Sequence, residues 1–415
     1  MTATASTRPM RSPARLIRAA GGAVTTQIVT AASSLVLQAL AARMLGADGF
    51  AQYALTYGTL IFAITLYTSW FGDTLTVLDR FDPRVRITLL HSAFAGAALT
   101  AVTTAAVGVF VLSPVQVGLA TVVAITWVCN ESMRRVFTAR TEFWRLAVND
   151  SLGAVVTVAV VVVAAASVTG LTVGWFFAAL AAGQSAATAI ALVRLPANEY
   201  LVREIRGGTF SDVASFAGWR AAQAGIRPLA LLLSRMVVGA AGGPVAVAAV
   251  EAARLLLAPA LTVANGAGTY VLSTFARASR DGRPPRSGDA ARASAVLAVG
   301  VGVLGAGALA LSGPLTRLVT GGGFAVDNRA VLGWAVYVVV FAATLPLSTL
   351  ATTRRLSRLV FRLRAAEMSV GLASLTLIVI IDSDSWWSAP YCLSVGGVLT
   401  ALMLWASLRR SDPAR

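Results

Sequence analysis

Residues 147–169 read AVNDSLGAVVTVAVVVVAAASVT, an apolar run of the length that an α-helix needs to cross a lipid bilayer. Eleven comparable runs occupy the rest of the chain, at approximately 19–42, 50–78, 87–112, 115–133, 171–193, 213–238, 245–272, 291–313, 330–352, 366–382 and 388–408. None of them alternates at the two-residue period of a transmembrane β-strand. We therefore predict an all-α, polytopic membrane protein with about twelve transmembrane helices.

The composition supports this prediction. Of the 415 residues, 57 % are hydrophobic and only 13 % are charged, and the mean hydropathy is +0.75. An average soluble domain is about 25 % charged. The connections between the apolar runs are too short for a folded domain outside the membrane. Any chemistry must therefore take place within the membrane or at its surface.

The basic residues indicate the orientation. All 34 are arginine, and they give a net charge of +16 against 18 acidic residues. If the N-terminus is cytoplasmic, 27 arginines fall on the cytoplasmic side, Arg220 and Arg227 fall within one run, and five lie outside. This asymmetry predicts that both termini lie in the cytoplasm. Arginine without lysine, together with abundant Ala, Val and Gly, is typical of GC-rich bacterial sequences, so we expect a bacterial cytoplasmic membrane. Because no single basic face remains, the asymmetry also argues against a nucleic-acid partner.

Two pairs of similar segments indicate an internal repeat. RMLGADGF at 43–50 follows the first run, and RMVVG at 235–239 follows the seventh. A second pair begins with Arg-Arg after the fourth and tenth runs, at 134–135 and 354–355. In each copy an arginine, an acid and a glycine follow, namely Arg145, Asp150 and Gly153 in the first and Arg364, Glu367 and Gly371 in the second. We predict a leader at 1–18, a six-helix lobe at 19–206 and a second, parallel six-helix lobe at 207–415.

The segment ARMLGADGFAQY at 42–53 resembles the A-R-x-L-G-x-x-G-[FY]-G-x-Y segment of polysaccharide-export flippases. These belong to the multidrug/oligosaccharidyl-lipid/polysaccharide (MOP) exporter superfamily. In the second half, Arg235 stands where an acidic residue is common, and Pro244 where an aromatic is usual. The resemblance implies two lobes around a V-shaped central cavity with alternating access to the two membrane faces.

The resemblance also implies a cargo. This would be a polyprenyl-diphosphate-linked oligosaccharide, moved to the outer leaflet for cell-surface polysaccharide assembly while its tail stays among the membrane lipids. Glycosyltransferases or a polymerase of the same pathway would be partners. Family members that act on the peptidoglycan precursor generally carry two further helices, which this chain lacks.

Three arginines are candidates for binding the diphosphate. Arg220 and Arg227 are seven residues apart and, at ~100° per residue, nearly share a helix face. Arg235 lies within roughly 80° of that stripe. Guanidinium groups stay charged and bind phosphate oxygens in a forked geometry, which suits a wet cavity within the membrane. The alternative is that these side chains extend to the membrane interfaces.

Four acidic residues complete the candidates. Glu251 and Arg254 are three residues apart and can form either a structural ion pair or a gate that opens when anionic cargo competes for Arg254. Asp73 is a candidate coupling-ion site, with an interfacial position as the alternative. We expect Asp150 and Glu367 to form salt bridges at equivalent places of the repeat.

No motif indicates an enzyme. The runs lack paired carboxylates, the chain has no His/Cys metal spacing, and a P-loop would need a lysine. We predict no catalytic residue, no metal and no cofactor. One alternative is a multidrug or small-molecule antiporter of the same superfamily, although cationic cargo favours cavity carboxylates. A second is an integral-membrane glycosyltransferase or polymerase, and a non-transporting scaffold is a third.

Overall fold

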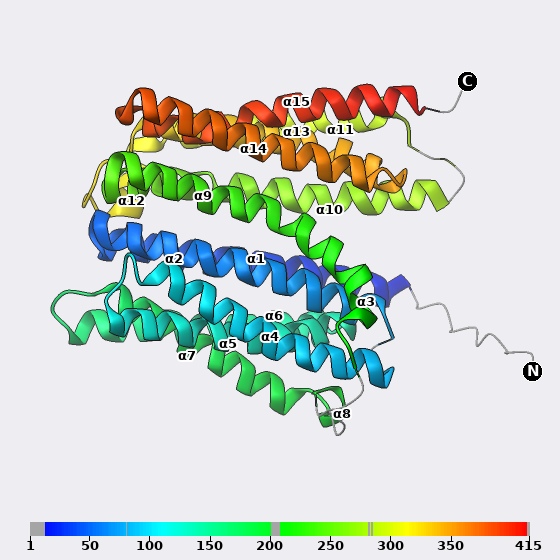
Figure 1. Cartoon of the computed structure of the whole chain (residues 1–415), viewed down its shortest axis with the longest axis horizontal. Coiled ribbons are helices and arrows are strands. Elements are labelled where there is room, and N and C mark those ends of the chain that lie inside the picture. The colour runs from blue at the N-terminus through cyan, green and yellow to red at the C-terminus, as the bar shows by residue number, and fades with distance from the viewer. Residues whose placement is uncertain (1–12, 80, 201–207, 281–282, 284, 413–415) are drawn as a thin grey trace, which may run out of the picture.

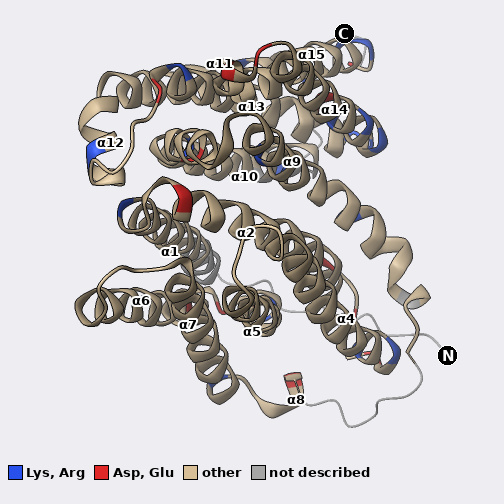
Figure 2. Ribbon diagram, turned by 60° about the vertical axis from the view of Figure 1, so that its left-hand side comes forward, with Lys and Arg blue, Asp and Glu red and all other residues tan. Residues whose placement is uncertain are grey.

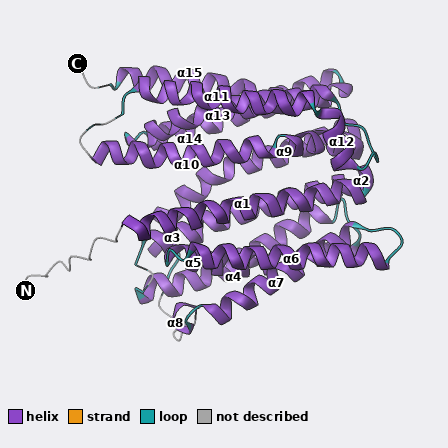
Figure 3. Ribbon diagram, turned by 180° about the vertical axis from the view of Figure 1, so that it is seen from behind, coloured by secondary structure: helices purple, strands orange, loops and turns teal. Residues whose placement is uncertain are grey.

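The computed structural model describes residues 13–79, 81–200, 208–280, 283 and 285–412, and within these ranges the secondary structure is entirely helical (Figure 1). Residues 1–12 of the predicted leader and the predicted lobe boundary at 206–207 lie outside the described residues. Figure 3 shows the same helices from behind. The prediction of an all-α membrane protein is confirmed.

The first lobe contains the first six predicted spans. Its helices are α1 (Pro13–Met44), α2 (Gly46–Tyr67), α3 (Asp73–Val77), α4 (Pro83–Gly108), α5 (Pro114–Ala139), α6 (Phe143–Ser167), α7 (Val173–Arg194) and α8 (Ala197–Tyr200). A π-helical turn, η1 (Thr68–Gly72), joins α2 to α3, so these elements form one continuous span.

The second lobe contains the other six predicted spans. Its helices are α9 (Ser211–Leu256), α10 (Ala258–Arg280), α11 (Ser287–Ala310), α12 (Ser312–Thr320), α13 (Asn328–Thr353), α14 (Ser357–Ile381) and α15 (Ala389–Arg410), with a 3-10 turn, η2 (Ser383–Ser388), before α15. The long α9 is broken at Gly243, where φ is +69°, and Pro244 follows. The seventh span therefore ends there, and the eighth continues through α10.

The number of spans agrees with the prediction. Ten helices of the described part of the chain are long and apolar enough to cross a membrane. Two more have the length but not the apolar character: α5, which carries Glu131, Arg134 and Arg135, and α10, which completes the span begun after Gly243. Together they account for about twelve spans of a multi-pass membrane protein.

The lobes contain matching helix pairs. α13 and α14 begin and end 214 residues after α5 and α6 (from 114 to 328, 139 to 353, 143 to 357 and 167 to 381). Between the helices of each pair stands one residue with positive φ, Thr141 at +60° and Arg355 at +63°. The following residues, Glu142 and Leu356, both donate their N–H to the carbonyl five positions earlier. This shared backbone geometry confirms the repeat.

The same geometry corrects the register that the sequence indicated. The structural counterpart of Arg354 is Arg140, six residues beyond Arg134, and the counterpart of Arg364 is Asp150. In the first pair of segments, the break at Gly46 (φ +66°) corresponds to the break at Gly243, not to Gly239. Short matches in a sequence rich in Ala, Gly and Arg can be made in several registers, whereas a left-handed turn fixes one.

The two lobes lie side by side with their ends aligned. The start of α1 and the end of α15 lie at one end of the molecule, which we call the termini end; α12 and the start of α2 lie at the opposite end (Figures 1 and 3). Figure 2 shows basic residues of α4, α14 and α15 at the termini end. α1 and α10 converge toward the opposite end, where the Phe50 and Phe324 rings stack with centroids 6.1 Å apart. One cluster of buried apolar side chains extends through both lobes.

Candidate functional site

Arg227, midway along the first part of α9, is held by aromatic side chains. Its Nε donates to the Tyr337 hydroxyl at 2.9 Å, and its guanidinium lies over the Phe341 ring, 3.8 Å from the centroid. Both rings belong to α13. Cation–π contacts of this kind stabilise a cation without neutralising it. Within the described residues, no carboxylate forms an ion pair with Arg227.

Arg364, on α14, lies near the same Phe341 ring. Its Nη2 donates to the Ser348 hydroxyl at 3.3 Å, and its guanidinium lies 5.9 Å from the centroid of the Phe341 ring. It too lacks an ion pair with any carboxylate that the structure describes. Arg364 is not among the diphosphate ligands predicted from the sequence, because the eleventh span was expected to begin at 366, whereas α14 begins at Ser357.

The two arginines line one cavity of about 290 Å³, which we call the C-lobe cavity. Its walls come from α9, α10, α13 and α14, and the lining residues are Gln223, Ile226, Arg227, Leu272, Leu345, Ser348, Thr349, Thr352, Val360, Arg364 and Met368. Two guanidiniums, several hydroxyls and an amide therefore share a space with no carboxylate on its wall. Such a site is suited to an anion with several oxygens, such as a phosphate group.

Glu367 lies behind this wall, one helical turn after Arg364. Its side chain is buried, with 7 % exposed, and its Oε2 atom has no hydrogen-bond partner. A Cβ atom on Gly397 of α15 would lie 3.3 Å from its Oε1. The prediction that Glu367 forms a salt bridge is wrong, because Glu367 forms none within the described residues. In the corrected register Glu367 corresponds to Gly153, not to Asp150, so the two acids were never equivalent.

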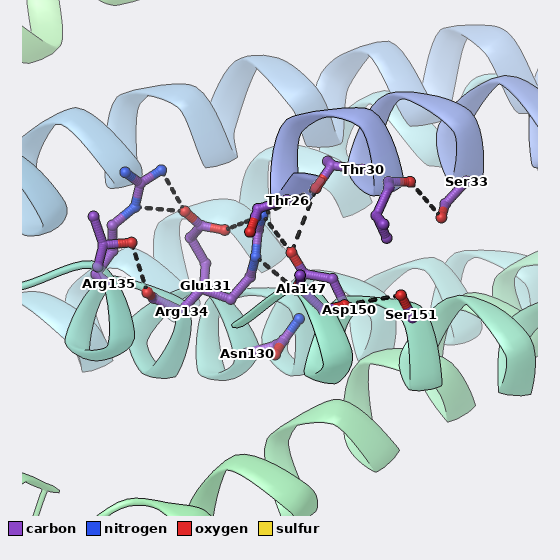
Figure 4. Close-up of polar contacts among 12 residues, drawn as sticks. Thr26, Thr30, Ser33, Asn130, Glu131, Arg134, Arg135, Ala147, Asp150 and Ser151 are labelled. Atoms are coloured by element: carbon purple, nitrogen blue, oxygen red, sulfur yellow. Dashed lines mark hydrogen bonds and ion pairs between the residues drawn. The ribbon is translucent and has the colours of Figure 1, made fainter. Parts of the chain in front are cut away.

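The first lobe carries a charged cluster at the equivalent helices α5 and α6 (Figure 4). Arg134 binds Asp150 through two hydrogen bonds of 3.0 Å, which confirms the expected salt bridge of Asp150. Glu131 accepts from Arg134 and from Arg135, each at 2.7 Å, and Thr30 of α1 donates to Asp150 at 3.4 Å. Two guanidiniums thus face two carboxylates, so the cluster carries no net charge.

A cavity of about 120 Å³, the N-lobe cavity, adjoins this cluster. It is lined by Thr30, Ser33, Ser34, Leu37, Tyr57, Trp127, Asn130, Arg134, Asp150, Gly153, Ala154, Thr157, Val158, Leu180, Gly183, Gln184 and Ala187. Asn130 donates to Gln184 at 2.6 Å within it. The single charged arginine on this wall is paired with the single carboxylate, in contrast to the C-lobe cavity.

Arg220 and Asp73, both predicted as site residues, bind each other. The Arg220 Nε donates to Asp73 Oδ2 at 2.6 Å, which joins α9 to α3 across the two lobes. The two side chains are 51 % and 28 % exposed. Neither therefore contributes a free charge to the C-lobe cavity, and the predicted coupling-ion role of Asp73 stays a prediction.

Arg235, Glu251 and Arg254 form a second network at the contact between the lobes. The predicted Glu251–Arg254 ion pair is present at 2.8 Å, and Arg235 binds the other side of Glu251 at 2.8 and 3.1 Å. Arg254 also donates to Gln38 of α1 at 2.8 Å. The Arg235 guanidinium packs so closely on α2 that a Cβ on Gly58 would lie 1.9 Å from it. Arg235 therefore has an acidic partner, which it shares with Arg254, and the three charged groups together carry one net positive charge. Arg227 is the one predicted diphosphate ligand that faces a cavity without an acidic partner among the described residues.

The described residues include no group of three or more His, Cys, Asp or Glu side chains placed to hold a metal ion. The fold and the two lobe cavities define a class: a two-lobed membrane protein with a pseudo-repeat of six helices and polar cavities within each lobe.

Several solved structures with a similar fold are of transporters of the MOP superfamily. An inward-facing multidrug-resistance MATE transporter of the superfamily has a TM-score of 0.68 and 13 % identity, over 93 % of this chain and 96 % of that chain. A superfamily transporter from Pyrococcus furiosus, described as having a binding pocket of reversed polarity that suggests a different function, has a TM-score of 0.63 and 12 % identity over 95 % and 94 %. A mutant of the Vibrio cholerae MATE transporter VcmN has a TM-score of 0.63 and 14 % identity over 96 % and 97 %.

At these identities the likeness establishes the fold. The chain matches no protein-family model and no curated protein sequence. The cargo must therefore be argued from the residues of this chain.

Proposed function

We propose that this protein is a transporter that moves a polyprenyl-diphosphate-linked oligosaccharide from the inner to the outer leaflet by alternating access. The membrane would be a bacterial cytoplasmic membrane, with both termini in the cytoplasm, and the cargo would serve cell-surface polysaccharide assembly. The transporter part of the proposal is supported by the shared fold. The observation that carries the cargo is the pair Arg227 and Arg364, which line one cavity without an acidic partner among the described residues.

Charge explains why an anionic cargo is favoured. A guanidinium at membrane depth costs at least about 2.5–3.5 kcal/mol on insertion scales, so Arg227, midway along its span and without an acidic partner among the described residues, needs a functional reason. A diphosphate supplies two negative charges and enough oxygens for a forked contact with each arginine. Cationic drugs would be repelled by the same pair. The reversed pocket polarity described for the Pyrococcus furiosus transporter is a precedent for different cargo on this fold.

The test uses purified protein in proteoliposomes and a fluorescent polyprenyl-diphosphate-linked saccharide. We expect the double variant R227A/R364A to lower the rate of transbilayer movement at least tenfold, because each lost charged contact is worth about 1.5–3 kcal/mol. Arg362→Ala is the matched control, since Arg362 is exposed on α14 only two residues from Arg364 and does not line the cavity. It should leave the rate unchanged.

Two results would overturn the proposal. One is a double variant that moves the lipid as fast as the unmodified protein. The other is ion-gradient-driven movement of a cationic dye by the unmodified protein with no movement of the lipid-linked saccharide, which would identify the antiporter alternative.

A further inference from the structure

Glu367 is a buried carboxyl group to which the proposed transport assigns no role. Its Oε2 has no hydrogen-bond partner, and only 7 % of the residue is exposed to solvent. The close packing of α14 on α15 holds it there: a Cβ on Gly396 would lie 2.4 Å from the Glu367 carbonyl oxygen. A buried carboxyl group with one oxygen unpartnered and no ion pair needs either a counter-charge or a proton, because an uncompensated buried carboxylate is very costly.

The counter-charge is within reach on the same helix. Arg364 and Glu367 are three residues apart, a spacing at which side chains meet. Three other Glu–Arg pairs with this spacing form ion pairs in the described part of the chain, Glu131–Arg134 at 2.7 Å, Glu142–Arg145 at 3.0 Å and Glu251–Arg254 at 2.8 Å. In all three, the glutamate precedes the arginine, the order that favours pairing. In the C-lobe the order is reversed, and Arg364 turns to Ser348 instead.

The surroundings of Glu367 contain few other charges. On its own helix the nearest is Arg364, and Arg227 on α9 also acts on it electrostatically. α13 contributes the Tyr337 hydroxyl, which acts on Arg364 and binds Arg227. α15 contributes the Thr400 hydroxyl, which acts on the carboxylate as a hydrogen-bond donor, and Gly397, which packs against Oε1. Both cations that act on Glu367 are the ones that line the C-lobe cavity.

We propose that the Glu367 carboxylate competes with the diphosphate for the Arg364 guanidinium. Protonation of Glu367 then allows the C-lobe cavity to bind a diphosphate ester. When the cavity is empty, ionised Glu367 pairs with Arg364 by a change of rotamer. When the diphosphate takes Arg364, Glu367 loses its partner and takes up one proton from water. The charge balance is then two cations against two anionic oxygens, with a neutral carboxylic acid behind the wall. This inference rests on the proposed function, since it assigns the regulation of the same cavity.

The sign of the pH dependence follows. Protonation removes the competitor, so diphosphate affinity is highest at low pH and falls as Glu367 ionises. The probe must not itself titrate in that range. A polyprenyl-diphosphate-linked monosaccharide is a diester of diphosphate and lacks the ionisation near pH 6 that a phosphate monoester has. Glu367 acts through Arg364 and is therefore a positioning residue.

The experiment measures the dissociation constant of this probe with the full-length protein in lipid nanodiscs, across about pH 5 to 8, for the unmodified protein, Glu367→Gln and the control Asp384→Asn. Asp384 is an exposed acid of η2. We expect the affinity of the unmodified protein and of Asp384→Asn to fall at least fivefold as pH rises, whereas Glu367→Gln binds tightly at every pH. A Glu367→Gln variant that keeps the pH dependence, or that binds as weakly as the unmodified protein at high pH, would overturn the inference.

A calorimetric measurement needs no variant. Titration of the probe in buffers of different ionisation enthalpy reports the protons taken up, and we expect a net uptake per diphosphate bound that is largest near the midpoint of the pH profile and disappears at both ends of it. Uptake of none would overturn the role of Glu367 while leaving the diphosphate site intact. Absence of probe binding at every pH would instead contradict the proposed function itself, so the two failures are distinguishable.

Discussion

The helix pair α5–α6 and its repeat counterpart α13–α14 have the same backbone geometry but differ in the charges of their side chains. In the first lobe, Arg134 on α5 binds Asp150 on α6. At the positions 214 residues later, Ser348 replaces the arginine and Arg364 replaces the aspartate, and the two still touch at 3.3 Å. Both lobes therefore have a contact at these two positions. In the first lobe it is a neutral ion pair, and in the second it joins a hydroxyl to a cation. This difference separates a charge that holds helices together from one left available to a ligand.

The largest effect is expected from breaking the neutral cluster. Glu131→Gln removes the carboxylate that both Arg134 and Arg135 bind, and the mostly buried guanidiniums, 20 % and 27 % exposed, lose their shared partner. Removing one member of a buried charge pair typically costs about 3–5 kcal/mol. We expect a drop of many degrees in the thermal unfolding midpoint in detergent. The exposed Asp384→Asn change is the control, and an equal midpoint for both variants would contradict a structural role of the cluster.

The opposite result is expected from the equivalent position of the second lobe. At about pH 5, where Glu367 is protonated under the proposal above, Arg364→Gln removes a cation that has no acidic partner among the described residues, so the free energy of unfolding should be unchanged or should rise by about 1–2 kcal/mol. Lipid movement should fall. The matched comparison is Asp150→Asn at the counterpart position, which should lower stability because it leaves Arg134 with one carboxylate. If Arg364→Gln destabilises as much as Asp150→Asn, Arg364 is structural, and the contrast between the lobes disappears.

The sequence predicted the spans because membrane insertion depends on apolar length, which is a local property. It also gave Arg227 as a candidate ligand, since an arginine deep within an apolar run is rare. It did not identify Arg364. That residue lies in the second turn of α14, near the end of a span, where an arginine is expected for topology alone.

The pairing of charges depends on tertiary structure and was harder to predict. Arg220 and Arg235 looked like Arg227 in the sequence, and only the fold brings Asp73 to one and Glu251 to the other. The predicted register of the repeat was wrong for a similar reason, because the Arg-Arg dipeptides at 134–135 and 354–355 do not occupy equivalent positions in the fold.

The smallest effect is expected where both lobes carry an equivalent ion pair at the termini end. Arg140 binds Glu199 at 2.7 Å after α7, and Arg354 binds Asp412 at 2.6 Å after α15. Burial by itself would raise the pKa of Asp412, but the hydrogen bonds from Ser287 and Arg354 outweigh it and hold this pKa below its ordinary value. The stabilisation is therefore present above the pKa of an unfolded aspartate and is lost as the pH falls through the lower, folded value.

Asp412→Asn should remove this acid-dependent part of the stability. At neutral pH the loss should be under about 1 kcal/mol, because the pair lies at the surface. Thermal unfolding midpoints from neutral pH down to about pH 3 would show the unmodified protein and the variant converging as Asp412 becomes protonated. Curves that stay parallel over that range would mean that Asp412 titrates alike in the folded and unfolded states. The repeat would then have kept the geometry of this contact in the second lobe but not its electrostatic contribution, as it did at Ser348 and Arg364.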